Sequence, residues 1–227
     1  MKLKTFFRIA VLMIKGKIKP SIILVNNFNF QGGGIGWLNI IIANSLTMEE
    51  GSRIGKFNLV HGGFDLIMHK RSWLEAHNRI TDGNYVVGGE RSKLELGEGV
   101  HIVVNHSFNM TGSIVLGNNT TIAGCGSYFW THSFLKIHSD QGIARVDGNI
   151  TIGENVYIAA NNVICPGVHI TDNVMTGAGT VVSKNLTKSG LYVSSSMRYI
   201  DFNADRDIDK YGKPVDRINN CNIYKKF

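Results

Sequence analysis

The chain has 227 residues, 43% of them hydrophobic, which suits one domain, or one domain with a small appendage, built on a real core. Glycine is abundant at 26 residues and proline is scarce at 3, a composition that favours tight corners between short strands and disfavours a disordered, proline-rich chain. The net charge of +7 comes mostly from the first twenty residues, and no basic patch with interleaved aromatic residues follows, which disfavours nucleic-acid binding.

The number and spacing of the cysteines indicate whether the protein works in an oxidising or a reducing compartment. The three cysteines are Cys125, Cys165 and Cys221, an odd number without a CxxC pair. A disulfide framework is therefore not expected, and we predict reduced thiols in a cytoplasmic protein.

Residues 1–20 predict a basic amphipathic helix that ends near Pro20. The segment mixes lysines with apolar residues and holds no acid. Arg8 interrupts the apolar run, which is also too short to span a bilayer, and no cleavage site follows. One interpretation is a helix that packs on the rest of the chain or on a neighbouring subunit. The other is a helix that rests on an anionic membrane surface, peripheral to the inner membrane face.

The main domain is predicted over residues 21–200, and its first half is irregular. Short apolar runs broken by Gly and Asn suggest early coils of a repeat whose period is blurred by insertions. A loop or a short helix is predicted over residues 69–80.

A clear repeat follows between Ile152 and Val182. The chain there divides into the hexapeptides IGENVY, IAANNV, ICPGVH, ITDNVM and TGAGTV. The fifth position of each holds a small or β-branched residue, with Asn162 as the exception. A period of six fits neither a lone helix nor a simple strand, but it fits a parallel β-helix in which each unit forms one flat side of a coil. Three units close a triangle, so Ile152 should stack on Ile170 in the next coil.

The repeat is interrupted at about Trp130 and returns at Ile152. Residues 131–148 are therefore predicted to protrude from the β-helix as a loop, and loops on a rigid scaffold are where function concentrates. The remaining residues, 201–227, are polar and charged and are predicted to form a short tail that contains a short helix.

These motifs resemble a known family. The hexapeptides, the ending GAGTVVSKN and the segment IAGCGSYFWTHSF are similar to the hexapeptide-repeat acyltransferases, in particular to their sugar O-acetyltransferase branch. The resemblance covers roughly residues 94–200. It implies an all-β, left-handed parallel β-helix, with acetyl-CoA as the acyl donor and a sugar or glycan hydroxyl as the acceptor, in surface polysaccharide biosynthesis. It also implies a homotrimer, because relatives complete the coenzyme groove with a neighbouring subunit.

The chemistry needs a base for the sugar hydroxyl. An imidazole is mostly neutral yet basic near pH 7, and His132 in WTHS matches the general base of the family. His138 is the alternative within the loop, and His106 is a residue that could line the same cleft. Asn105 matches an asparagine that orients the acceptor in relatives. A glutamate that orients the histidine in relatives is replaced here, which leaves Asp147 or a backbone carbonyl as its partner.

The resemblance also assigns the coenzyme groove. Small residues let backbone amides reach the pantetheine arm, and groups beyond the last repeat reach the nucleotide. The residues are Ala159, Ala160, Gly177, Ala178, Ser183, Lys184 and Arg198. Lysine and arginine suit phosphates because they supply charge-assisted donors.

Three alternatives remain open from the sequence. The acceptor could be the amine of an amino sugar. A γ-type zinc hydratase would need three converging histidines, but no supporting motif accompanies them, so no metal is predicted. A scaffold that binds a glycan without turnover would have no need to interrupt its repeat at WTH.

Overall fold

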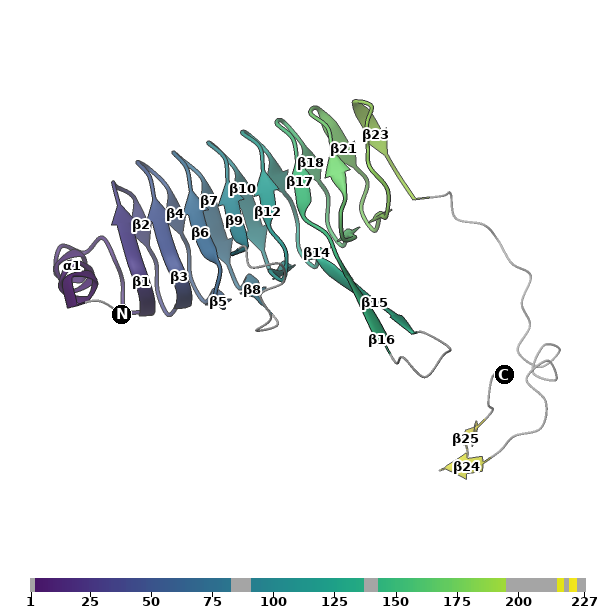
Figure 1. The fold of residues 1–227 in the computed structure, drawn as a ribbon, viewed down its shortest axis with the longest axis horizontal. Coiled ribbons are helices and arrows are strands. Elements are labelled where there is room, and N and C mark those ends of the chain that lie inside the picture. Colours follow the sequence, from purple (N-terminus) through teal and green to yellow (C-terminus); the bar gives the residue numbers. More distant parts are fainter. Residues whose placement is uncertain (1–2, 83–90, 137–142, 195–215, 219–220, 224–227) are drawn as a thin grey trace. The chain divides into compact units, whose positions relative to one another are not determined.

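A computed structural model describes residues 3–82, 91–136, 143–194, 216–218 and 221–223 of the chain. The chain divides into two compact units, Met1–Ser194 and Ser195–Phe227. In the second unit the described strands β24 (Asp216–Ile218) and β25 (Cys221–Ile223) pair in antiparallel fashion, and these described residues of the tail contain no helix. The first unit is a left-handed parallel β-helix with one short helix, α1, at its end (Figure 1). This confirms the fold class that the hexapeptides predicted.

The β-helix has three faces, which we call A, B and C. Face A contains β2 (Gly34–Ile35), β4 (Arg53–Ile54), β7 (Trp73–Ala76), β10 (His101–Val104), β13 (Thr121–Ile122), β18 (Tyr157–Ile158), β21 (Val174–Thr176) and β23 (Gly190–Tyr192). Face B contains β5 (Leu59–His61), β8 (Arg79–Thr81), β11 (Ser107–Asn109), β14 (Tyr128–Phe129), β19 (Val163–Ile164) and β22 (Val181–Val182). Face C contains β6 (Asp65–Met68), β9 (Lys93–Leu96), β12 (Ile114–Leu116), β17 (Ile150–Ile152) and β20 (His169–Ile170). The longer strands β1 (Ile22–Phe30) and β3 (Ile40–Met48) bend from face B into face C.

The stacking register follows the predicted period. Ile152 pairs with Ile170 in the next coil, and Ile164 pairs with Val182. The early coils stack in the same parallel way although their lengths vary, which corrects the prediction of a loop or short helix over residues 69–80. That segment contains β7 and β8, which stack on their neighbours in the same parallel way.

The edge between faces A and B, edge A/B, is built from left-handed corners and buried amides. Leu38, Phe57, His77, Asn105 and Asn161 adopt positive φ there. Each corner is followed by a polar residue whose side chain points into the β-helix. These side chains form hydrogen bonds with neighbouring coils. In the last described coils, the amide of buried Asn162 donates to the carbonyls of Ala159 and Gly177. This explains the polar exception in the repeat, because Asn162 satisfies backbone groups that would otherwise be buried without partners.

Helix α1 (Leu3–Ile14) covers the first coil. It ends earlier than Pro20, because Gly16 adopts a φ of 69° and the amide of Lys17 bonds to the carbonyl of Leu12. This arrangement is a Schellman cap, which glycine permits without strain. No helix among the described residues is long and apolar enough to cross a membrane.

The predicted protruding segment is a hairpin in the residues that the structure describes. Strands β15 (His132–Lys136) and β16 (Ile143–Asp147) pair in antiparallel fashion. The hairpin leaves the β-helix between β14 and β17, and so from the edge between faces B and C, edge B/C (Figure 1).

The three faces differ in what they expose. Large exposed hydrophobic side chains form outward columns on face A, including Trp73, Tyr157 and Leu191, and on face B, including Ile22 and Val181. No strand of face C carries such a residue among those described. Two faces of the β-helix are therefore suited to contact another protein surface and one is suited to water.

Candidate active site

His132 stands where the β-helix opens into the hairpin. It is the first residue of β15 and directly follows Thr131, which is fully buried after β14. The antiparallel ladder pairs it with Asp147, the last residue of β16. The hairpin thus holds His132 at edge B/C.

The ring of His132 is held by the preceding coil. Its Nδ1 atom lies 2.9 Å from Oδ1 of Asn109 and 3.2 Å from Oγ1 of Thr111. The hydroxyl of Thr131 also lies 3.0 Å from Oδ1 of Asn109. Since an amide oxygen only accepts, the hydrogen of His132 resides on Nδ1 and leaves a free lone pair on Nε2. This is the tautomer that a general base requires.

Asp147 has a different partner. Its two carboxylate oxygens lie 3.0 Å from Nε and 3.1 Å from Nη2 of Arg145. The described hydrogen-bond contacts of the His132 ring are with the side chains of Asn109 and Thr111, and not with Asp147 or a backbone carbonyl, which were the predicted partners. Asp147 remains beside His132 through the strand pairing.

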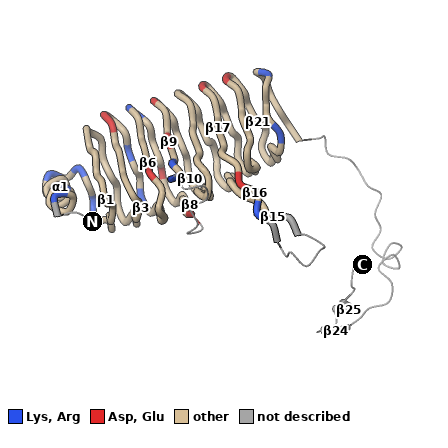
Figure 2. The backbone as a smooth tube through the Cα atoms, viewed as in Figure 1, with Lys and Arg blue, Asp and Glu red and all other residues tan. Residues whose placement is uncertain are grey.

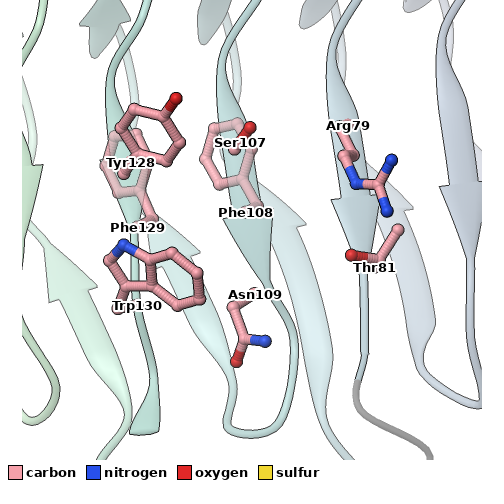
Figure 3. A pocket seen from close by; sticks show the side chains of 8 residues that line it. All are labelled: Arg79, Thr81, Ser107, Phe108, Asn109, Tyr128, Phe129 and Trp130. Carbon is pink, nitrogen blue, oxygen red and sulfur yellow. The ribbon is translucent and has the colours of Figure 1, made fainter. Parts of the chain in front are cut away.

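An aromatic groove lies on face B beside His132. It has a volume of about 220 Å³ and is walled by outward side chains of β8, β11 and β14, with Phe108 and Phe129 beneath (Figure 3). Tyr128 and Trp130 stack in parallel with ring centroids 6.4 Å apart, and Trp130 meets the ring of His132 edge-on at 6.1 Å. Arg79 lies at the opposite wall (Figure 3). The groove therefore offers flat rings and one cation.

A second hollow of similar volume lies at edge B/C. It is polar and is lined by Arg91, Thr111, Ser113, Asp147 and Asn149 among others. Asn109 lines the aromatic groove and Thr111 lines this hollow, and both contact His132. The histidine therefore stands between an aromatic groove and a polar one.

The predicted coenzyme residues lie on two different edges. Ala159 and Ala160 follow β18 and Gly177 and Ala178 follow β21, which places them on edge A/B. Asn105 follows β10 and lies on the same edge, away from His132. Ser183 and Lys184 follow β22 and lie on edge B/C, two coils beyond the hairpin. Arg198 lies outside the described residues. Within one chain, therefore, His132 shares an edge with Ser183 and Lys184, but not with Asn105 or the small residues of the predicted coenzyme groove.

The other candidate histidines do not join His132. His106 is buried at edge A/B, where Nδ1 accepts the amide hydrogen of Ser127. Burial lowers the pKa of His106 to about 4, so its ring is neutral. His138 lies outside the described residues. Among the residues that are described, no group of three or more His, Cys, Asp and Glu side chains is placed to hold a metal ion.

Four residues of the site were not predicted from the sequence. They are Asn109, Tyr128, Trp130 and Arg79. Tyr128 and Trp130 alternate around buried Phe129, a spacing that places both on the outside of one strand beside WTH. That spacing was a usable signal, whereas Asn109 could be found only from the stacking of coils.

Comparisons with known proteins agree with the fold and the repeat. Residues 149–184 match the family described as Bacterial transferase hexapeptide (six repeats). The chain is 32% identical over 123 residues to galactoside O-acetyltransferase of Escherichia coli (strain K12), an alignment that covers 52% of this chain and 61% of that one. It is 37% identical over 87 residues to the putative acetyltransferase YvoF of Bacillus subtilis (strain 168), covering 38% of this chain and 46% of that one.

A solved structure extends the similarity of fold. The polySia specific acetyltransferase NeuO superposes with a TM-score of 0.60 at 16% identity, covering 77% of this chain and 83% of that one. The alignments with the curated relatives named above span less than two thirds of their lengths. Residues 149–184 therefore contain the hexapeptide repeat, and the predicted resemblance of the chain to the sugar O-acetyltransferase branch of the hexapeptide-repeat acyltransferases is confirmed.

Proposed function

We propose that this chain is an acetyl-CoA-dependent O-acetyltransferase that modifies a sugar hydroxyl in surface polysaccharide biosynthesis, on the cytoplasmic side of the membrane. The observation that carries the proposal is the hydrogen bond between Nδ1 of His132 and Oδ1 of Asn109, which leaves Nε2 free to accept a proton. The similarity to a galactoside O-acetyltransferase supports the reaction class.

In the proposed reaction, His132 first accepts a proton from the sugar hydroxyl and then donates it to the leaving thiolate. Nε2 takes the proton of the sugar hydroxyl as its oxygen attacks the thioester carbonyl of acetyl-CoA, because an alcohol is barely ionised near pH 7. The tetrahedral intermediate then collapses, the carbon–sulfur bond breaks, and the imidazolium returns the proton to the leaving thiolate. Asn109 accepts the hydrogen on Nδ1 throughout, so the ring keeps one orientation and only Nε2 gains and loses a proton.

The aromatic groove is the proposed acceptor site. Sugar rings present C–H faces that pack on flat aromatic surfaces, and Tyr128 and Trp130 form such a surface beside His132. Arg79 at the far wall adds a cation that suits a hydroxyl-rich or anionic acceptor.

A neighbouring subunit would complete the coenzyme site. Edge A/B carries the small residues and Asn105, whereas edge B/C carries His132 and Lys184. A contact between unlike edges is heterologous, and such contacts form a closed ring when the rotation between neighbouring subunits closes. The exposed apolar columns of faces A and B support this assembly, and we propose a homotrimer with a site at each interface. An active monomer in light scattering would contradict it.

The test is release of coenzyme A thiol from acetyl-CoA by the purified full chain, with a panel of free, nucleotide-linked and polymeric sugars. We expect release with a hydroxyl acceptor, and His132→Ala should lower turnover by about two to four orders of magnitude. His169→Ala is the matched control, because His169 is exposed in a regular coil of face C. Release only with amino sugars would make the acceptor an amine, and a folded, fully active His132→Ala variant would exclude His132 as the base.

A further inference from the structure

Helix α1 has one side that is covered by the first coil and another that is not. Thr5 and Ile9 are buried against the first coil, and the guanidinium of Arg8 donates to the carbonyls of Phe28 and Phe30 at 3.2 and 2.7 Å. The helix is therefore fixed to the β-helix by side-chain contacts that use one of its sides.

The uncovered side exposes large hydrophobic residues. Phe6, Phe7, Val11 and Ile14 are 53%, 59%, 47% and 86% exposed. Phe7, Val11 and Ile14 are spaced i, i+4 and i+7, which places them in one stripe along the helix. An apolar hollow of about 520 Å³, lined in part by Met13, adjoins the helix. An exposed apolar surface of this kind, flanked by polar residues, marks a site of interaction with a protein or a membrane.

The charge around this stripe is wholly positive. The first 48 residues contain six lysines and arginines and no acid, so they supply six of the seven net charges, and the remaining 18 basic and 17 acidic residues supply one. Lys4, Lys15, Lys17 and Lys19 are all exposed, and in the described part of the chain no ion pair involves them. Figure 2 shows this basic cluster at α1 and the turn that follows it.

We propose that the exposed stripe of α1 docks on an anionic lipid surface, with the helix lying in the interface. Large apolar residues beside lysines are the composition of helices that bind anionic lipid bilayers. A second copy of this chain is a poorer occupant, because it would bring the same positive charge, and lysine is depleted at protein interfaces. The proposal is independent of acetyl transfer.

The experiment is flotation of the full chain with two kinds of vesicle, one of phosphatidylcholine alone and one that also contains phosphatidylglycerol. We expect binding to the anionic vesicle only, and weaker binding as salt rises. Phe7→Gln with Ile14→Gln should lower the binding constant by about ten-fold or more, because both apolar side chains are lost while glutamine preserves the helix. Each of Lys15→Gln and Lys19→Gln should lower it by about five-fold.

The matched control is Phe134→Gln with Val146→Gln, which removes two exposed apolar side chains from the hairpin instead. It should bind vesicles as the unmodified chain does. Equal binding by the helix variant, or no binding of the unmodified chain to anionic vesicles, would overturn the proposal. Dissociation of the oligomer in the helix variant, with vesicle binding unchanged, would assign the stripe to a neighbouring copy and would also overturn it.

Discussion

The Nδ1 atom of His132 lies 2.9 Å from Oδ1 of Asn109, and the two residues stand at the same edge on consecutive coils. The coil below therefore fixes the tautomer of the histidine above it. The partner of His132 in this contact does not belong to the hairpin, because Asn109 ends β11 on the β-helix. A rigid support of this kind suits a base whose ring must keep one orientation through the reaction.

Asn109 is predicted to act as a positioning residue. Asn109→Ala should lower kcat by roughly ten-fold to a hundred-fold, a part of the effect of losing the base. Asn109→Asp should keep more activity and move the acidic limb of the pH–rate profile to higher pH, because a carboxylate stabilises the protonated imidazole. Steady-state kinetics across pH would check both. An unchanged pH profile in a folded Asn109→Asp variant would show that the contact does not govern the base.

Tyr128 is predicted to bind the acceptor without taking part in proton transfer. Its ring lines the groove and stacks on Trp130, which in turn contacts His132. Tyr128→Ala should raise the acceptor KM by about five-fold, the loss expected for one aromatic contact of about 1 kcal/mol. The KM for acetyl-CoA should stay constant and acts as the internal control. Equal changes in both KM values would contradict a role restricted to the acceptor.

Lys184 and Arg198 are predicted to hold the phosphates of the coenzyme. Lys184 is exposed on edge B/C beyond the hairpin, and the placement of Arg198 is a prediction from the sequence. Lys184→Ala and Arg198→Ala should each raise the acetyl-CoA KM several-fold, since an exposed charged contact contributes about 1 kcal/mol. Turnover at saturation should not change, because these contacts are the same in the ground and transition states. Lys188→Ala, another exposed lysine, is the control, and an unchanged KM at low salt would leave backbone amides as the main contacts.

The hexapeptide period predicts the strands of the late coils but not those of the early coils, because only the late coils have a constant length. From Ile152 onward each side is six residues long, so the buried positions recur at a constant interval. Leu74 and Ile102 also stack on each other, but 28 residues separate them because the intervening chain contains an insertion. For the same reason the contact between Asn109 and His132 could not be predicted from the sequence. Asn109 precedes His132 by 23 residues, whereas the regular coil has eighteen. Periodicity identifies the scaffold, whereas contacts between coils of unequal length require the structure.

A cluster on face C should make stability depend on pH. His69 lies between two glutamates, with Nδ1 3.0 Å from Glu49 and Nε2 3.0 Å from Glu95. The hydrogen bond to Glu95, followed by that to Glu49, outweighs the opposing effect of burial and raises the pKa of His69 above its ordinary value of 6.5. Lys93, followed by His69, lowers the pKa of Glu95 below its ordinary value of 4.5.

The signs of the two shifts define a window of greatest stability. The raised pKa of His69 means that the protonated ring stabilises the folded state fully below pH 6.5, and that this contribution is lost as pH rises through the folded pKa. The lowered pKa of Glu95 stabilises the fold above pH 4.5, and that contribution is lost as pH falls through its folded pKa. The free energy of unfolding should therefore decline above pH 6.5, by under about 1 kcal/mol because the groups are partly exposed. Denaturant unfolding of His69→Gln across pH should lack this decline, whereas His169→Gln, exposed on the same face, should retain it. A decline of the same size in His69→Gln would assign the pH dependence to another group.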